Sequence, residues 1–313
     1  MELFAIDGNP VPDGAIVGTV VAGDGIRLRY ARWRGATRRS QGTVCVLQGR
    51  GEAIEKYFET ITDLRNRGFA VATFDWRGQG GSERRLRDPM KGHVDSFAEY
   101  DRDLEAFVQQ VVLPDCAPPY FGLAHSTGGL IALRAAHSGR LRFTRTVLLA
   151  PQVAFGPTRP PEPLPRWLAT VMTAVGLGEA SAPGQAAETM LNIPFEGNRL
   201  TADPKRFALS RDLALKLPQL FVRGPTFGWI YAACSAMGEV ADPSFAAAIR
   251  VPMLTVVGAL DRAVSVTAVE RVASGMRAGG QVVIPGAEHD LLMERDVVRE
   301  QVFAAFDAFV PGG

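Results

Sequence analysis

The chain has 313 residues, of which 47% are hydrophobic and 21% are charged, and its formal net charge is +1. This length fits one large globular domain or a core with an insertion, and the balanced charge gives no basis for a nucleic-acid partner. The chain has three cysteines, an odd number, and they are far apart in the sequence. This pattern argues against a disulfide framework and against a zinc site. The first residues lack the basic and apolar segments of a secretory signal, and no uncharged apolar run reaches the roughly 20 residues that span a bilayer. We therefore expect a reduced, cytoplasmic protein.

Strand-like and helix-like segments alternate over the first 150 residues. Residues 15–22 and 26–33 alternate in polarity and are predicted to form antiparallel strands joined at a glycine-rich turn. After them the pattern predicts buried strands at 43–48, 69–74, 120–125 and 144–150, and helices at 54–67, 96–112 and 127–137. Strands that alternate with helices predict a mostly parallel sheet with right-handed crossovers.

The composition changes near residue 151. A proline-dense segment, 157–165, leaves the predicted sheet, and no strong strand pattern appears between 151 and 250. Short helices are predicted there at 166–176, 204–217 and 227–237. The α/β pattern then returns, with strands at 251–258 and 281–284 and helices at 266–276 and 294–309. We predict a doubly wound α/β core, residues 1–150 and 251–313, interrupted by a helical cap, residues 151–250.

Ser126 lies in the stretch GLAHSTGG, between a predicted strand and a predicted helix. A serine on such a tight turn projects its hydroxyl above the carboxyl edge of the sheet, where it can act as a nucleophile. The turn needs small residues two positions before and after the serine. Gly128 meets this need, and Ala124 adds only one methyl group. The alternative interpretation is that Ser126 is a helix N-cap.

A serine hydroxyl needs an adjacent base, and the chain has four histidines. His289 follows the last predicted strand, so it lies at the same sheet edge as Ser126. His125 neighbours the serine, but on a tight turn its side chain should point elsewhere. Asp261 follows the preceding strand and is placed to accept the Nδ1–H of His289. The order Ser126, Asp261, His289 is the one that α/β-hydrolases use.

Acyl transfer also needs donors for the developing oxyanion. One candidate is the backbone N–H of Thr127, at the positive end of its helix. The second is the backbone N–H of Arg50, in the loop QGRGE after the strand at 43–48. This chemistry requires neither a metal nor an organic cofactor. Asp75, in the stretch DWRGQGGS, is expected to have a structural role in its glycine-rich turn.

These motifs resemble α/β-hydrolases of the monoglyceride-lipase and bacterial lysophospholipase branch, often labelled serine aminopeptidase-like. The resemblance covers nearly the whole chain and is carried by LQGRGEAIEKY, FDWRGQGGSER, VVGALDRAVS and PGAEHDLLMER. The chain departs from many members at Gln48, where they have histidine, and at Ala124. The resemblance implies an α/β-hydrolase fold and a serine hydrolase that cleaves the carboxylic ester of a monoacyl lipid, either a lysophospholipid or a monoacylglycerol.

The cap segment is rich in large apolar side chains. We expect most of them to form the cap's own core and the others to line an apolar channel over Ser126; the candidates are Phe155, Trp167, Phe227 and Trp229. The stretch 164–178 is apolar with little charge. It is either a buried cap helix or a peripheral anchor that rests on a membrane surface.

Other functions stay open at this stage. An aminopeptidase on the same scaffold would need an acidic pocket for a free α-amine, with Glu162, Glu179 and Glu188 as cap candidates. A short-chain carboxylesterase would use the same catalytic residues, and a non-catalytic ligand binder would use the fold alone. The sequence predicts no head group, acyl-chain length or oligomeric state.

Overall fold

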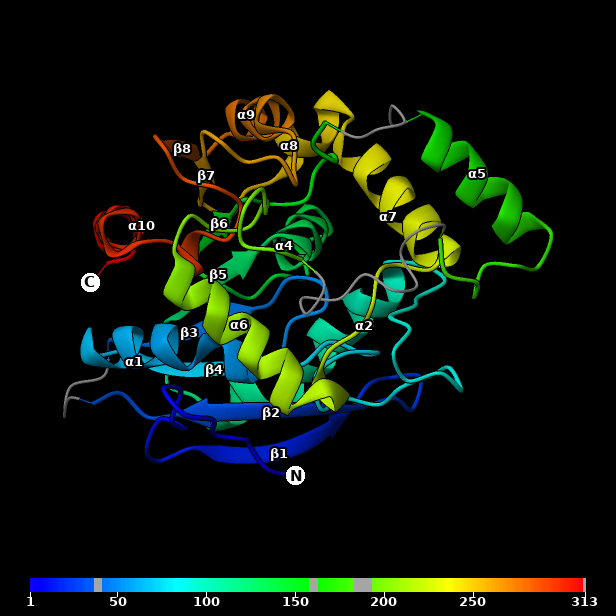
Figure 1. Cartoon of the computed structure of the whole chain (residues 1–313). Helices are drawn as coiled ribbons and strands as arrows, with labels where there is room; N and C mark the ends of the chain where they lie inside the picture. The colour runs from blue at the N-terminus through cyan, green and yellow to red at the C-terminus, as the bar shows by residue number, and fades with distance from the viewer. Residues whose placement is uncertain (37–40, 158–162, 183–192, 312–313) are drawn as a thin grey trace.

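An eight-stranded sheet in the order β1-β2-β4-β3-β5-β6-β7-β8 forms the centre of the computed structural model, which describes residues 1–36, 41–157, 163–182 and 193–311 (Figure 1). β1 and β2 pair antiparallel, β2 pairs antiparallel with β4, and the other neighbours are parallel. The strands are β1 (Ile16–Val21), β2 (Arg27–Trp33), β3 (Thr43–Leu47), β4 (Ala70–Phe74), β5 (Tyr120–His125), β6 (Arg145–Leu149), β7 (Met253–Gly258) and β8 (Gly279–Ile284). The predicted strands and the mostly parallel sheet are confirmed.

Helices cover both faces of this sheet, which makes it doubly wound (Figure 1). One face packs against α1 (Phe58–Asn66) and α10 (Asp296–Phe309), and the other against α2 (Ala98–Phe107), α4 (Thr127–His137) and α9 (Val266–Gly275). Four shorter segments complete the core: η1 (Ile54–Tyr57), η2 (Val108–Val112), α3 (Leu113–Asp115) and η5 (Leu291–Met293). The central strand β3 is buried at every position, as expected for a parallel strand with helices on both sides.

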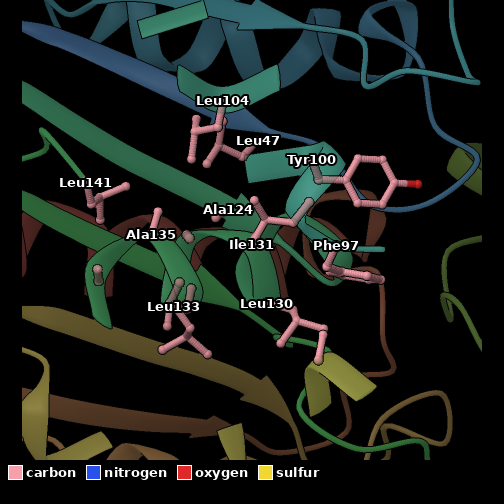
Figure 2. Packing of buried hydrophobic residues seen from close by; sticks show 14 of the residues in the cluster. Leu47, Phe97, Tyr100, Leu104, Ala124, Leu130, Ile131, Leu133, Ala135 and Leu141 are labelled. Carbon is pink, nitrogen blue, oxygen red and sulfur yellow. The ribbon is translucent and has the colours of Figure 1, made fainter. Parts of the chain in front are cut away.

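Helix α4 is packed into the centre of one face. Figure 2 shows Ile131 of α4 next to Ala124 of β5, and Leu130 pointing away from Ala124; Tyr100 and Leu104 of α2 belong to the same cluster. These side chains expose at most 4% of their surface. This packing fixes the start of α4 directly beyond the end of β5.

Between β6 and β7, the residues that the structure describes form four helices and a short turn: α5 (Pro163–Ala174), α6 (Pro204–Lys216), η4 (Pro218–Leu220), α7 (Phe227–Val240) and α8 (Pro243–Ala248). Three of these helices match predicted ones, and α8 was missed because its six residues give no helical period. The described part of 151–250 contains no strand, while residues 158–162 of the proline-dense segment lie outside the described residues. α7 lies between α4 and the outermost helix, α5 (Figure 1). None of the helices in the described ranges has the length and apolar character to cross a bilayer.

A buried ion network lies under the loop that follows β3. The Arg29 guanidinium on β2 donates to Glu55 Oε2 at 2.7 Å and to Asp75 Oδ2 at 2.6 Å. Asp75 also accepts the Gly81 N–H at 2.8 Å, within the glycine-rich turn where a structural role was expected, and the Gln48 amide at 3.1 Å. The network therefore joins β2, the end of β3 and the turn after β4.

The Arg29→Met substitution tests how much this network contributes to stability. It leaves two buried carboxylates without their cation, so the free energy of unfolding should fall by about 3–5 kcal/mol in urea denaturation. The matched control is Arg27→Met on the same strand, because Arg27 is 67% exposed and pairs with Glu83 at the surface. That control should lose less than about 1 kcal/mol, and equal losses would contradict the role of the buried network.

Candidate active site

Ser126 occupies a strained turn between β5 and α4. Its φ is 50° and its ψ is −114°, a backbone conformation that residues with a side chain rarely adopt. The turn presses the start of α4 against the end of β3, where a Cβ on Gly128 would lie 2.5 Å from the Leu47 carbonyl oxygen. Only glycine fits there. Ala124, by contrast, places its methyl group in the buried core, so the alanine is accommodated.

The Ser126 hydroxyl lies in one chain of contacts with His289 and Asp261, the two residues that the sequence analysis predicted at the carboxyl edge of the sheet. Ser126 Oγ lies 3.1 Å from His289 Nε2, and His289 Nδ1 lies 2.8 Å from Asp261 Oδ2. The three residues follow β5, β7 and β8. The sheet therefore brings together residues separated by up to 163 positions in the chain.

Asp261 is held by its own loop as well as by the histidine. Its Oδ1 accepts the backbone N–H groups of Ala263 at 2.8 Å and Val264 at 3.0 Å. Burial alone would raise the pKa of the Asp261 carboxyl, but the hydrogen bond and charge of His289, together with these two N–H groups, lower that pKa below its ordinary value. Asp261 is thus kept ionised and oriented toward His289.

The other three histidines have partners other than Ser126, although the centroid of the His125 ring lies 5.0 Å from that of the His289 ring. His125 turns its Nδ1 toward Glu52, 3.2 Å from Oε1. His93 is buried under the start of α7, where its Nδ1 lies 2.8 Å from Thr226 Oγ1. His137 is exposed at the end of α4 and stacks on Phe245.

The loop after β3 borders the same cavity as Ser126. Both residues predicted to supply oxyanion donors, Arg50 and Thr127, line this cavity, with Thr127 as the first residue of α4. Gln79 holds the loop from the core side: its amide donates to the Gly49 carbonyl at 2.8 Å, and its Oε1 accepts the Gly51 N–H at 3.0 Å. The Gln48 amide donates to Asp75 Oδ1 at 3.1 Å and so joins the buried ion network.

A buried charged cluster forms part of the cavity wall beside Ser126. The Lys56 ammonium contacts Glu52 Oε1 at 2.6 Å and also Asp290. The Tyr57 hydroxyl donates a hydrogen bond to Glu52 Oε2. Glu52, His125 and Asp290 have the spacing of a metal-binding group. In this chain the lysine ammonium supplies the positive charge between the two carboxylates. The sequence analysis missed this cluster, although Glu52 and Lys56 show the i, i+4 spacing of an ion pair.

The cavity over Ser126 has a volume of about 360 Å³. Of the four side chains proposed to line it, Phe155 and Trp229 do so. Trp167 is 61% exposed on the outer side of α5, and Phe227 is buried in the small cluster between α5 and α7, so neither is among the lining residues. Phe221, one of the large apolar side chains of the cap segment, also lines the cavity. The sequence analysis missed five further apolar lining residues from α6 and its flanks: Ile193, Leu200, Phe207, Leu213 and Val222.

The spacing of Phe207, Ser210 and Leu213 on α6 could have indicated that one face of this helix points into the cavity. Among the candidate acidic residues for an amine pocket, Glu179 is exposed and is not one of the lining residues. Glu162 and Glu188 lie outside the described residues.

The pairing of His125 with Glu52 predicts a specific pH dependence of stability. Burial lowers the pKa of His125, but the charge and hydrogen bond of Glu52 outweigh this and raise it above 6.5. A raised folded-state pKa stabilises the fold fully below the unfolded value and loses that contribution as pH rises through the folded value. The difference in unfolding free energy between wild type and His125→Gln should therefore be largest at acidic pH and shrink above pH 6.5. A difference that is constant or grows with pH would rule out the pairing as its cause.

Known proteins share both the sequence and the fold of this chain. The family described as serine aminopeptidase, S33, matches residues 38–296. Lysophospholipase L2 of Escherichia coli is 31% identical over 91% of this chain and 84% of its own, and a probable lysophospholipase L2 of Haemophilus influenzae is 28% identical over 91% and 88%.

Among solved structures, a monoglyceride lipase of Saccharomyces cerevisiae superposes with a TM-score of 0.76 at 20% identity, covering 96% of this chain and 98% of that one. This likeness confirms the α/β-hydrolase fold. The chain therefore belongs to the serine aminopeptidase S33 family, a group of hydrolases built on that fold.

Proposed function

We propose that this protein is a serine carboxylic-ester hydrolase that releases the acyl chain of a monoacyl lipid through an acyl-enzyme. The observation that carries the proposal is the continuous relay from Ser126 through His289 to Asp261, at the wall of a cavity with apolar lining from the cap. The triad geometry supports acyl transfer. The names of the relatives, lysophospholipase L2 and monoglyceride lipase, support the substrate class.

In the proposed reaction, Ser126 Oγ attacks the ester carbonyl while His289 Nε2 accepts the hydroxyl proton. Asp261 holds the His289 Nδ1–H and stabilises the imidazolium that forms. The backbone N–H groups of Arg50 and Thr127 donate to the oxyanion. His289 then gives its proton to the leaving alcohol, which departs from the acyl-enzyme.

Water completes the cycle by the same route. His289 accepts a proton from water as the water oxygen attacks the acyl carbonyl. When the second tetrahedral intermediate collapses, the bond to Ser126 Oγ breaks, His289 Nε2 returns its proton to that oxygen, and the free acid leaves. The chain's own residues supply every proton transfer in this sequence, so the proposal assigns no step to a metal or an organic cofactor. The residues proposed to contact the acyl chain are apolar ones of the cavity, including Phe155 and Trp229.

The charges around the cavity favour an ester over a peptide with a free α-amine. A substrate ammonium needs a carboxylate that is not already neutralised. The two carboxylates in the described cavity lining, Glu52 and Asp290, both contact the Lys56 ammonium. Aminopeptidase activity is therefore the weaker alternative, despite the family's description.

The proposal is tested with a hydrolysis panel on wild type and Ser126→Ala. The panel contains lysophosphatidylcholine, a monoacylglycerol, short and long p-nitrophenyl esters and an aminoacyl p-nitroanilide. Long monoacyl lipids should turn over fastest in wild type, and Ser126→Ala should lose at least about 1,000-fold in kcat because the nucleophile is gone. Asp261→Asn should also lose kcat with an intact fold, because the histidine tautomer is no longer fixed.

The other possible results of the hydrolysis panel would each replace or overturn the proposal in a different way. Turnover of the anilide alone would replace the lipid proposal with a peptidase, and turnover of acetate esters alone would replace it with a short-chain carboxylesterase. Equal activity of Ser126→Ala and wild type would overturn the mechanism. Specific lipid binding without turnover in either protein would identify a non-catalytic ligand binder.

We further propose that residues 151–250 form a cap whose outer helix, α5, rests on a lipid surface. Four exposed apolar residues follow one another at helical spacing: Leu164, Trp167 and Val171 on α5 and Val175 directly after it, exposed by 52%, 61%, 37% and 64%. α5 carries no acidic residue and one basic residue, Arg166. Such a stripe with an interfacial tryptophan is typical of helices that lie in the plane of a membrane surface.

A Leu164→Ser/Trp167→Ser variant tests this surface. Its partitioning onto phosphatidylcholine–phosphatidylglycerol vesicles, measured by co-sedimentation, should fall by about 10-fold or more because two apolar side chains no longer enter the interface. Hydrolysis of a water-soluble short ester should not change. Leu215→Ser on α6 is the control, because Leu215 is 62% exposed but stands outside the stripe. Unchanged partitioning of the double variant would exclude α5 as the contact.

A further inference from the structure

We propose that the side chain of Arg50 positions its own backbone N–H, by fastening the oxyanion loop to the cap. This inference rests on the proposed function, in which that N–H stabilises the oxyanion. The reason lies in the loop sequence, where Gly49 and Gly51 flank Arg50. Gly51 has a φ of 72°, and glycines on both sides leave the intervening peptide groups with unusual rotational freedom. An oxyanion donor must instead be held in one direction before the substrate arrives.

The Arg50 side chain reaches from this loop to two parts of the cap. Its Nη2 donates to the Arg223 carbonyl at 2.8 Å, in the segment between η4 and α7. Its guanidinium carbon lies 4.9 Å from the centroid of the Trp229 ring, on α7. A planar guanidinium that is both hydrogen-bonded along its edge and stacked on its face has little freedom left to move.

Both attachment points are themselves fixed to the core. Trp229 donates its Nε1–H to the hydroxyl of Tyr100 on α2 at 3.1 Å, and both side chains are buried. The backbone N–H of Arg223 donates to the Met90 carbonyl at 2.8 Å. Arg50 therefore binds cap groups that are held in place.

The opposite side of the loop is held through its main chain. Gln79 binds the Gly49 carbonyl and the Gly51 N–H, and Glu52 accepts the Gly49 N–H. These bonds fix both neighbours of Arg50. The Gly49 carbonyl and the Arg50 N–H belong to one planar peptide group, so the bond from Gln79 also orients that N–H. The Arg50 side chain adds a second anchor at the Cα atom next to this peptide group, from the side of the cap. A displacement of Arg223 or Trp229 would then reach the oxyanion donor directly, so the cap and the catalytic loop are coupled.

The experiment compares Arg50→Met with wild type on a short and a long p-nitrophenyl ester. Methionine keeps an unbranched side chain but removes the donors and the planar cation. We expect kcat to fall by about 10-fold for both esters with KM changed less than about 2-fold, because the loss is confined to transition-state binding. Affinity for an alkylboronic acid, which mimics the tetrahedral intermediate, should fall by a similar factor, while affinity for the fatty-acid product stays the same. The control is Arg271→Met, an exposed residue on α9.

A second set of variants tests whether Arg50 acts through Trp229. Trp229→Leu removes the aromatic face on which the guanidinium lies and should lower kcat on the short ester by about as much as Arg50→Met does. In the double variant Arg50→Met/Trp229→Leu, kcat on the short ester should fall no further than in the more impaired single variant. Either substitution alone already breaks the contact between the two side chains, so the second has no contact left to remove. Fully additive losses would contradict the coupling.

Results for the Arg50 variants test the positioning role, and the result for Ser126→Ala tests the proposed function. If Arg50→Met raises KM for the long ester alone and keeps kcat, the side chain binds substrate and the positioning role is wrong. If active-site titration with a fluorophosphonate shows fewer reactive sites and the remaining ones have wild-type kcat, the residue only supports folding, and the inference is again wrong. If Ser126→Ala stays active, the proposed function itself fails, whatever Arg50 does.

Discussion

The contact between the start of α4 and the end of β3 is the constraint on which the site depends. With no Cβ at Gly128, the helix can begin against the carbonyl groups of Leu47 and Gln48. Ser126, two residues earlier, takes its positive φ in the same turn, and its hydroxyl lies within 3.1 Å of His289 Nε2. The same approach also places the first turn of α4 beside the loop that carries Arg50. The absence of a side chain at Gly128 thus permits the contact that brings the proposed nucleophile and both proposed oxyanion donors together.

Much of this arrangement could be predicted because its signals are local or follow from sheet topology. Parallel strands separated by helices must all end at one edge, so Asp261 and His289 were predictable from their positions just after strands. The turn at Ser126 was predictable from its small neighbours. The alternating strands β1 and β2 also followed from period and turn residues alone.

The rest of the site depends on contacts that no local pattern encodes. Trp167 and Phe227 are as apolar as Trp229, but only the rotation of α5 and α7 decides which side chain faces solvent, another helix or the cavity. The ion pair between Lys56 and Asp290 joins residues 234 positions apart in the chain. It connects η1 with the loop after β8, which carries His289. The role proposed for the Arg50 side chain likewise depends on where α7 lies, which hydrophobic periodicity does not specify.

The strained backbone at Ser126 also limits which residues could ever serve as the nucleophile. Threonine carries the same hydroxyl on the same carbon, so chemistry alone would allow the exchange. A β-branched residue at a φ of 50° is a severe outlier, however, because its second γ substituent crowds the backbone. The position is thus closed to threonine by geometry rather than by reactivity. An evolving member of this lineage could exchange the serine hydroxyl for a cysteine thiol, which is unbranched, more readily than for a second alcohol.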